Sequence, residues 1–297
     1  MQKWIKKHSY IVLMTPYVLM FSIFILIPVI VSVGLSFTYF NSVEMPKFTG
    51  LSNYIQLITN DDIFMQKVLP NTLIYGLFVG VGGYVLSFIM AWSLAQITKI
   101  PRTILAVILY SPSLTGGVLL SIVWGVIFSG DANGYLNALL LKWNWIETPI
   151  LWLQSEKYLL PIMIIVSLWS SMGVGFLSML AGILNADEEV YEAGKIDGIK
   201  NRFQEVIYIT IPQVMPQMLF GAIMAITGTF TSSGVGTVLS GSNPTPGYAG
   251  QLIVNHMEDY AFIRMEMGYA SAIAVALLIA IRLCSNVVNR LFGERGD

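Results

Sequence analysis

Charged residues are scarce in this sequence. Of its 297 residues, only 11% are Asp, Glu, Lys or Arg, whereas 55% are hydrophobic. Soluble domains usually carry about 25% charged residues. The hydrophobic residues lie in long blocks that are nearly free of charge, and about 20 apolar residues suffice for a helix to cross the roughly 30 Å core of a bilayer. The composition therefore predicts a polytopic membrane protein.

Cysteine and histidine are rarer still. The single cysteine, Cys284, excludes an intrachain disulfide and a multi-cysteine metal site. The two histidines, His8 and His256, lie far apart in the sequence, and neither has a predicted role. We therefore expect no metal site and no catalytic residue. The net charge of −1 gives no electrostatic reason to expect nucleic acid as a partner.

Six apolar blocks are long enough to form membrane-spanning helices. They cover residues 10–37, 72–97, 104–128, 158–184, 214–235 and 267–288. These blocks predict an all-α fold, a polytopic membrane helical bundle that forms a single transmembrane domain over residues 1–297.

The positions of Lys and Arg predict the orientation, because positive residues are retained in the cytoplasm. With the N-terminus inside, ten of them lie in cytoplasmic segments and five outside, and Arg282 remains within the sixth span. Arg282 lies close enough to the inner end of that span for its side chain to reach the cytoplasmic surface. Both termini are therefore predicted to be cytoplasmic.

The predicted cytoplasmic loop 185–212 is unusually long and charged. Asp187 and the acidic residues after it suit the first turn of a helix, and Gly198 favours the left-handed turn that ends one. A second helical stretch begins at Asn201, and Pro212 bends the chain before the fifth span. The loop therefore predicts a helix–glycine–helix hairpin, whose small apolar face would be covered by a soluble partner.

A family resemblance becomes visible in this hairpin. The Glu-Ala-Ala loop of binding-protein-dependent ABC importer permeases resembles Glu192-Ala193-Gly194-Lys195-Ile196-Asp197-Gly198, followed by Phe203, Ile211 and Pro212. The maltose- and glycerol-phosphate-type sugar permeases are similar at Gly50-Leu51-Ser52-Asn53-Tyr54 and at Gly268-Tyr269-Ala270-Ser271-Ala272. The sequence departs from the family at Gly194, where alanine is usual, and by one extra residue between Gly198 and Pro212.

The resemblance implies the type I ABC importer permease fold and a coupling helix that seats in a groove of an ATPase. The implied coupling residues are Glu192, Ala193, Gly194, Asp197, Gly198, Phe203 and Pro212. The implied partners are a second homologous permease subunit, two cytoplasmic ATPase subunits, an extracytoplasmic sugar-binding protein and the lipid of a bacterial cytoplasmic membrane.

The sequence has no Gly-x-x-x-x-Gly-Lys-Ser/Thr phosphate-binding loop. ATP and Mg are therefore expected on the partner ATPases, and this chain is expected to be a non-catalytic subunit that binds no cofactor.

The resemblance also implies a path for a carbohydrate, such as an oligosaccharide, near the middle of the fourth and fifth spans. The candidates offer a ring face or uncharged hydrogen-bonding groups to a sugar: Trp169, Ser170, Ser171, Gly173, Thr229, Thr231, Ser232 and Ser233. Hydrogen bonds between helices explain any single hydroxyl equally well. The sequence does not indicate which sugar is carried or whether it is charged.

Two other classes of function would need residues that this sequence largely lacks. A stand-alone secondary transporter or channel for a small polar solute would use acidic residues within the membrane for ion coupling, and no predicted span holds an interior Asp or Glu. A membrane-embedded enzyme would need clustered His, Asp or Glu, and only Glu258 and Asp259 lie beside His256. The importer subunit remains the favoured hypothesis.

Overall fold

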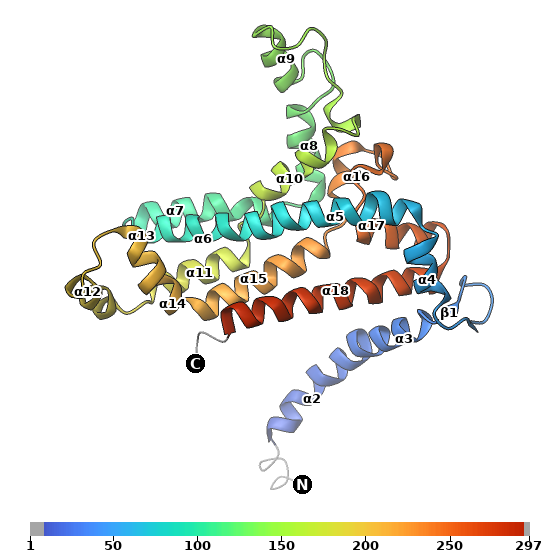
Figure 1. Cartoon of the computed structure of the whole chain (residues 1–297), viewed down its shortest axis with the longest axis horizontal. Helices are drawn as coiled ribbons and strands as arrows, with labels where there is room; N and C mark the ends of the chain where they lie inside the picture. The colour runs from blue at the N-terminus through green and yellow to red at the C-terminus, as the bar shows by residue number, and fades with distance from the viewer. Residues whose placement is uncertain (1–8, 294–297) are drawn as a thin grey trace. The chain divides into compact units, whose positions relative to one another are not determined.

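The computed structural model describes residues 9–293 of the chain. Within this range the regular secondary structure is helical apart from one sheet of two short strands (Figure 1). The described residues divide into two compact units. One unit contains residues 9–61 and 256–278, and the other contains residues 62–255 and 279–293.

The smaller unit begins with a nearly continuous helix made of α2 (Ser9–Phe21), the π-helical turn η1 (Ser22–Leu26) and α3 (Ile27–Leu35). No side chain between Leu13 and Leu35 is buried within this chain. An apolar helix of this length needs lipid or another protein around it, because water would solvate its side chains poorly. The helix begins one residue before the predicted first span, 10–37, and ends two residues before the end of that span.

A short antiparallel ribbon follows this helix. Strand β1 (Thr38–Tyr39) pairs with β2 (Lys47–Phe48), with Thr38 opposite Phe48. Four further elements belong to this unit entirely or in part: α4 (Ser52–Thr59), α17 (Ile253–Glu258), η8 (Asp259–Ile263) and α18 (Met267–Gly293).

A buried polar cluster joins the two sequence segments of the smaller unit. The Asp61 carboxylate accepts a hydrogen bond of 2.8 Å from the Tyr269 hydroxyl and lies 2.8 Å from Nε2 of His256. The Tyr260 ring packs edge-on against the rings of His256 and Tyr269. Burial, reinforced by the Asp61 carboxylate, raises the pKa of Tyr260 to about 12. Residues about 200 positions apart in the sequence are thereby held together.

The larger unit begins with one long helix of four consecutive segments: η2 (Phe64–Val68), α5 (Leu69–Tyr75), η3 (Gly76–Val81) and α6 (Gly82–Ala95). Segments η2 and η3 are π-helical, so they place more residues in each turn than an α-helix does. The helix starts eight residues before the predicted second span, 72–97.

The third apolar block is not a straight helix. It consists of α7 (Lys99–Tyr110), the 3₁₀ turn η4 (Ser111–Leu114) and α8 (Gly117–Ile127). The helix direction changes by 100° at the break. Thr115 and Gly116 there have extended backbone conformations, which cannot continue a helix. The loop beyond α8 contains α9 (Tyr135–Lys142) and η5 (Trp152–Gln154).

The fourth and fifth apolar blocks are also interrupted. The fourth consists of α10 (Leu159–Trp169) and α11 (Val174–Leu184), and α12 (Glu188–Ile196) follows it. The chain then forms α13 (Arg202–Glu205), η6 (Val206–Thr210), α14 (Ile211–Gln213), α15 (Met215–Phe230), α16 (Val235–Ser240) and η7 (Pro246–Tyr248). The chain turns by 82° between α14 and α15.

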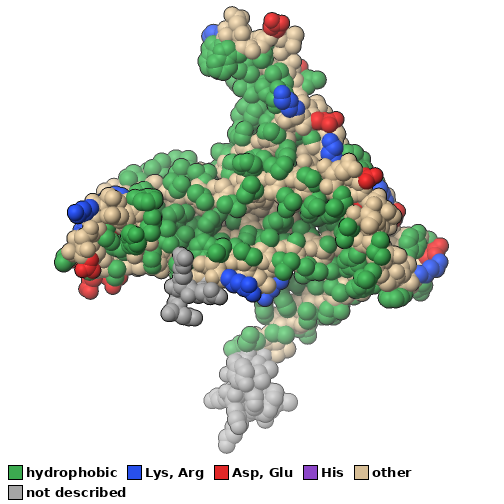
Figure 2. Space-filling model, viewed as in Figure 1, with side chains coloured by type: hydrophobic (Ala, Val, Ile, Leu, Met, Phe, Trp, Pro, Cys, Tyr) green, Lys and Arg blue, Asp and Glu red, His purple; other side chains and the backbone are tan. Residues whose placement is uncertain are grey.

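Four described helices are long and apolar enough to cross a membrane, and six spans result if each bent pair is counted as one. This count agrees with the six predicted spans. On the face shown in Figure 2, hydrophobic side chains cover most of the long helices, whereas charged side chains gather over the loops, over the α12 region and in a basic patch on the C-terminal part of α18. The apolar helix surfaces suit lipid, and the charged loops suit water.

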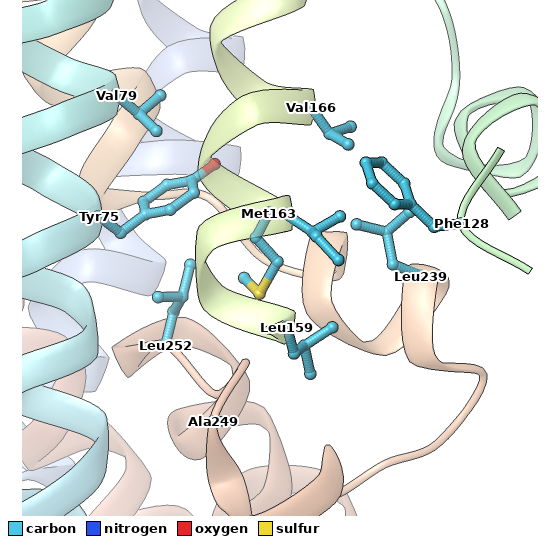
Figure 3. Packing of buried hydrophobic residues seen from close by; sticks show 10 residues of the cluster. Tyr75, Val79, Phe128, Leu159, Met163, Val166, Leu239, Ala249 and Leu252 are labelled. Atoms are coloured by element: carbon cyan, nitrogen blue, oxygen red, sulfur yellow. The ribbon is translucent and has the colours of Figure 1, made fainter. Parts of the chain in front are cut away.

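Close helix packing fixes the core of the larger unit. Helix α11 approaches α15 so closely that a Cβ added to Gly175 would lie 3.0 Å from Cα of Gly221. This contact is the kind that small residues permit between membrane helices. A second buried cluster surrounds Met163 of α10, with Tyr75 and Val79 on one side and Phe128 and Leu239 on the other (Figure 3).

Candidate functional site

The fourth and fifth apolar blocks break at similar sequences. Helix α10 ends and α11 begins around Trp169-Ser170-Ser171-Met172-Gly173, and helix α15 ends and α16 begins around Phe230-Thr231-Ser232-Ser233-Gly234. A break leaves backbone carbonyls without helical partners, which is costly in lipid unless protein groups or a water-filled cavity satisfy them. Hydroxyl groups reinforce the helix ends at both breaks: Ser171 Oγ donates to Leu168 O at 2.8 Å and Thr231 Oγ1 donates to Thr227 O at 2.7 Å, and each of these carbonyls also accepts a hydrogen bond from a backbone amide.

A cavity of about 270 Å³ lies between these breaks and the long helix that contains η3. Its lining combines hydroxyl groups, two tyrosine rings and small residues. It comprises Tyr75, Val79, Gly83, Tyr84, Ser167, Ser170, Ser171, Met224, Ala225, Gly228, Thr229, Ser232 and Val235. No charged side chain is among these lining residues.

The two tyrosines differ in their hydrogen bonding. The Tyr75 hydroxyl donates to Ser167 Oγ at 2.8 Å and lies 3.4 Å from Ser232 Oγ, so it bridges the helices across the cavity. The Tyr84 hydroxyl is buried and has no hydrogen-bond partner among the described residues. A buried hydroxyl without a partner is costly, which makes Tyr84 a natural donor or acceptor for a molecule that enters the cavity.

The π-helical segment η3 brings both tyrosines to the same cavity. In a uniform α-helix, residues nine positions apart point in directions about 180° apart, so Tyr75 and Tyr84 would lie on opposite faces. The segment Gly76–Val81 between them turns by a smaller angle per residue, because a π-helix has more residues per turn. The local change of period therefore allows both residues to face the same space.

The predicted cytoplasmic loop forms a hairpin with defined caps. The Asp187 side chain caps α12 by accepting a hydrogen bond from the Glu189 amide at 3.0 Å. At the other end Gly198 has φ +98°, and the amide of Ile199 donates to Gly194 O at 3.0 Å while the amide of Gly198 reaches Lys195 O at 3.4 Å. These two bonds form a Schellman motif, which requires a left-handed residue at the glycine.

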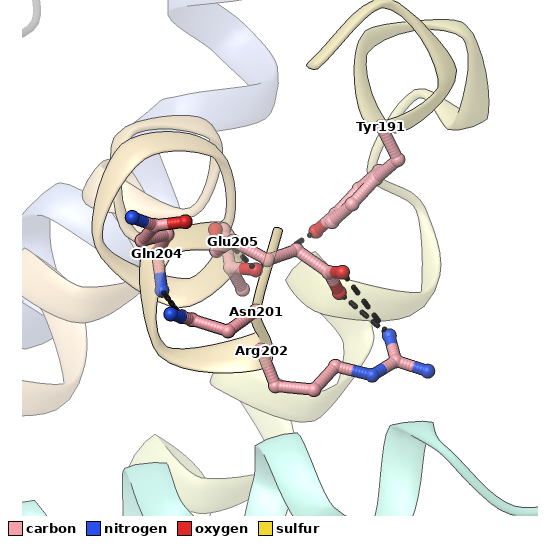
Figure 4. Close-up of polar contacts among 6 residues, drawn as sticks. Tyr191, Asn201, Arg202, Gln204 and Glu205 are labelled. Carbon is pink, nitrogen blue, oxygen red and sulfur yellow. Dashed lines mark hydrogen bonds and ion pairs between the residues drawn. The ribbon is translucent and has the colours of Figure 1, made fainter. Parts of the chain in front are cut away.

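The second half of the hairpin has its own cap. The Asn201 side chain accepts a hydrogen bond from the Gln204 amide at 2.8 Å (Figure 4), and the Gln204 side chain accepts one from the Lys200 amide at 3.0 Å. Arg202 forms an ion pair of 2.8 Å with Glu205. The Tyr191 hydroxyl donates to Thr210 Oγ1 at 3.1 Å, which ties α12 to η6. The hairpin is therefore held by its own side chains.

Gly194 lies where α12 rests on η6. A Cβ added to Gly194 would lie 2.5 Å from Cδ1 of Ile209 and 3.1 Å from Cδ1 of Ile199. Ile209 is buried and fills the space that a methyl group at position 194 would need. Packing against Ile209 thus explains why this chain has glycine at a position where the resembled family has alanine.

The comparison with known proteins agrees with this architecture. A family model described as "Binding-protein-dependent transport system inner membrane component" matches residues 83–295. This chain belongs to that family. It is therefore a multi-pass membrane protein and the permease component of an ABC importer, as its hairpin motif predicted.

Relatives match along most of the chain. The arabinooligosaccharides transport system permease protein of Bacillus subtilis is 31% identical over 290 residues, which cover 97% of this chain and 90% of that protein. The lactose transport system permease protein of Rhizobium radiobacter is 32% identical over 72% of this chain and 70% of its own length. The multiple sugar-binding transport system permease protein of Streptococcus mutans is 29% identical over 80% of this chain and 79% of its own length.

Solved structures share the fold. A bacterial ABC transporter that imports the acidic polysaccharide alginate superposes with a TM-score of 0.80 at 19% identity, covering 99% of this chain and 98% of the other. A bacterial alginate ABC transporter in complex with an alginate pentasaccharide-bound periplasmic protein gives a TM-score of 0.81 at 18% identity, covering 99% of this chain and 98% of the other. The predicted type I permease fold is thereby confirmed.

The structure brings together half of the predicted substrate-path residues. Ser170, Ser171, Thr229 and Ser232 line the cavity. The other four candidates are absent from its lining: Trp169, Gly173, Thr231 and Ser233.

Each of these four residues has another environment. The Trp169 ring packs edge-on against the Trp124 ring, 5.5 Å between centroids. Ser233 lines a separate cavity of about 220 Å³. Thr231 is exposed, and its hydroxyl bonds the backbone, while Gly173 lies nearest to Ser113. Their predicted role in a substrate path remains a prediction.

Sequence reasoning did not find the residues that complete the cavity: Tyr75, Val79, Gly83, Tyr84, Ser167, Met224, Ala225, Gly228 and Val235. The available signal was weak. Tyr75 and Tyr84 are polar groups inside a block without charge, but their spacing in an α-helix places them on opposite faces.

The predicted coupling residues divide into an exposed and a packed set. Glu192, Ala193, Asp197, Phe203 and Pro212 are exposed, as is Gly198 at the turn, whereas Gly194 is buried. Two apolar residues are largely exposed to solvent: 74% of the surface of Phe203 and 87% of the surface of Ile196 are accessible. The hairpin thus has exposed apolar side chains, in agreement with the apolar face that was predicted.

The residues weighed for an enzyme do not form a catalytic cluster. His256 is buried against Asp61, and Asp259 pairs with Nε of Arg264 at 2.8 Å. Within the described residues, no group of three or more His, Cys, Asp or Glu side chains could hold a metal ion. The relatives of this chain are ABC permease subunits, which is consistent with a non-catalytic membrane component.

Proposed function

We propose that this chain forms one half of the membrane path of an oligosaccharide importer. The cavity between the two broken helices carries this proposal, because it offers hydroxyls and tyrosine rings in the membrane-spanning part of the chain. A sugar has many hydroxyls and apolar ring faces, and both kinds of group find partners there. The names of the relatives, which include arabinooligosaccharide and lactose transport permeases, support the same cargo class.

The hairpin is proposed to couple the path to ATP hydrolysis on separate subunits. Its caps and its Schellman motif make it stiff, and Ile196 and Phe203 offer apolar side chains that an ATPase groove would bury. Glu192, Ala193 and Asp197 lie exposed around them. Closure of two ATPases would then move the permeases as nearly rigid bodies and expose the cavity to the other side of the membrane.

The remaining features of the proposal concern orientation and assembly. Both termini and the hairpin face the cytoplasm, because the positive residues lie mainly on that side. The chain works in a bacterial cytoplasmic membrane with a second homologous permease, two ATPases and an extracytoplasmic sugar-binding protein. The importer of the solved relative likewise includes a periplasmic protein, in that case bound to an alginate pentasaccharide.

Uptake by cells tests this function. Deletion of the gene should abolish accumulation of at least one labelled oligosaccharide from a panel of arabino-, galacto-, malto- and xylo-oligosaccharides. Reintroduction of the wild-type chain should restore accumulation, whereas a chain with Gly198→Val should not. An unchanged uptake profile across the panel after deletion would contradict the proposal.

A further inference from the structure

The charge of the cargo can be inferred from the helices that line the cavity. The sequence contains no Asp, Glu, Lys or Arg at residues 68–98, 158–186 or 206–257. These three stretches supply all of the cavity-lining residues. A charged ligand in this cavity would therefore find no counter-charge on the walls that this chain provides.

The physical cost of this arrangement falls on charged molecules of either sign. An ion that leaves water for a membrane interior is destabilised unless an opposite charge or several strong hydrogen bonds replace its hydration. The hydroxyls here are weak substitutes, because several already donate to nearby oxygens: Tyr75 to Ser167, Ser171 to Leu168 O and Thr229 to Ala225 O. A neutral sugar does not carry the hydration free energy of an ion, so it has no comparable loss when it leaves water.

We propose that the permease itself selects uncharged sugars and rejects acidic ones at this cavity, independently of the binding protein. This selection rests on the proposed function, since it assigns the cargo class of the same cavity. The contrast is with the transporter of the same fold that imports the acidic polysaccharide alginate. Tyr84 contributes specificity for a neutral ligand, because its free hydroxyl can bond a sugar hydroxyl without introducing charge.

The reactivity of introduced cysteines tests the electrostatic part directly, without knowledge of the cargo. Ser170→Cys and Ser232→Cys are made in a chain whose single cysteine is replaced (Cys284→Ala), and the complete transporter is reconstituted in lipid nanodiscs. Three methanethiosulfonate reagents of similar size are compared: a neutral methyl, an anionic sulfonatoethyl and a cationic aminoethyl compound. Asn133→Cys, in the exposed loop before α9, is the reference site.

We expect the rate ratio of neutral to anionic reagent to be at least tenfold larger at both cavity sites than at the reference site. The nearby Asp131 already slows the anionic reagent at the reference, so this comparison underestimates the difference. Addition of a cation through Met224→Lys, at a lining residue, should selectively accelerate the anionic reagent. Equal ratios at all three sites, or no reaction of the cavity cysteines with the neutral reagent, would overturn the proposal.

Protection of an introduced cysteine by sugars distinguishes this inference from the proposed function. Arabinotriose, a neutral probe, should slow the neutral reagent at Ser232→Cys at least threefold, and trigalacturonate, an acidic probe, should not. Protection by both probes would overturn charge selection while supporting a sugar path. If neither probe, nor any neutral probe from the wider oligosaccharide panel, protects Ser232→Cys from the neutral reagent, the sugar path through this cavity is refuted. The reagent ratios then report the charge preference of a cavity with another cargo.

Discussion

Gly198 is the residue whose replacement should most cleanly disturb coupling. Its φ of +98° lies in the left-handed region, and no atom lies within 4 Å of the position that a Cβ would take. Any effect of a side chain at this position must therefore come from the backbone conformation and not from a clash. The turn supports the two Schellman bonds that end α12, from Ile199 to Gly194 and from Gly198 to Lys195.

The magnitude follows from this geometry. An L-residue in a left-handed conformation costs about 1–2 kcal/mol, and a β-branched residue lies at the upper end of that range. Such a cost changes the ratio of ordered to disordered hairpin by about 5- to 30-fold. Gly198→Val should lose the most order, Gly198→Ala less, and Gly198→Asn should stay near wild type because asparagine tolerates this conformation.

The assay compares these three variants in the purified transporter. ATPase copurification and sugar-stimulated ATP hydrolysis should fall in the order Asn, Ala, Val, while membrane insertion and pairing with the second permease stay normal. Hydrogen exchange at the Ile199 amide should accelerate in the same order, because that amide donates the Schellman bond. Equal coupling in the Val and Asn variants would refute the role assigned to this turn.

Four further predictions address other parts of the molecule. Gly194→Ala should weaken coupling because its Cβ would lie 2.5 Å from Ile209 Cδ1, and Ile209→Val in the same chain should restore it, as judged by ATPase copurification. Tyr84→Phe should reduce sugar uptake several-fold with normal assembly, since one hydrogen bond contributes about 0.5–1.5 kcal/mol; unchanged uptake would exclude contact with the cargo. A tyrosine whose folded-state pKa is raised stabilises the fold below its ordinary pKa near 10, so thermal stability should fall as the pH rises from about 10 to 12, and Tyr260→Phe should flatten that fall. Asn243→Cys in a cysteine-free chain should react with an impermeant reagent added from outside, and protection there would reverse the predicted orientation.

The helical fold and the hairpin could be predicted because their signals are local. Long runs without charge predict helices in lipid, and the acidic residues that begin at Asp187 together with Gly198 predict where α12 begins and ends. The structure has α12 from Glu188 to Ile196, directly between these two signals. Local rules suffice wherever the deciding interactions lie within a few residues of each other.

The breaks within the apolar blocks could be predicted only in part. Pro212 predicted a bend before the fifth span, and the chain turns by 82° between α14 and α15. The 100° bend of the third block at Thr115 and Gly116 was not predicted. The residues on both sides of the bend are as apolar as those of a continuous membrane helix. Hydropathy measures the preference for lipid and is insensitive to the direction of the backbone.

Long-range contacts were beyond sequence reasoning. His256 had no predicted role because its partner, Asp61, lies 195 positions away. The cavity depends likewise on three separate stretches, and only the hydroxyl-rich breaks at Ser170 and Ser232 were visible as candidates. A pattern in one stretch carries no information about the stretch that folds against it.

The π-helical segment Gly76–Val81 makes the helix period a determinant of the cavity. Removal of one residue from this segment would convert its wide turn toward an α-helical turn, and Tyr75 and the present Tyr84, then eight positions apart, would point about 80° apart and still face the same space. Loss of the wide turn at unchanged length would instead place them about 180° apart, although neither residue had been replaced. In this permease the surface that meets the cargo therefore tolerates a one-residue deletion in this segment better than a substitution that converts the segment to a uniform α-helix.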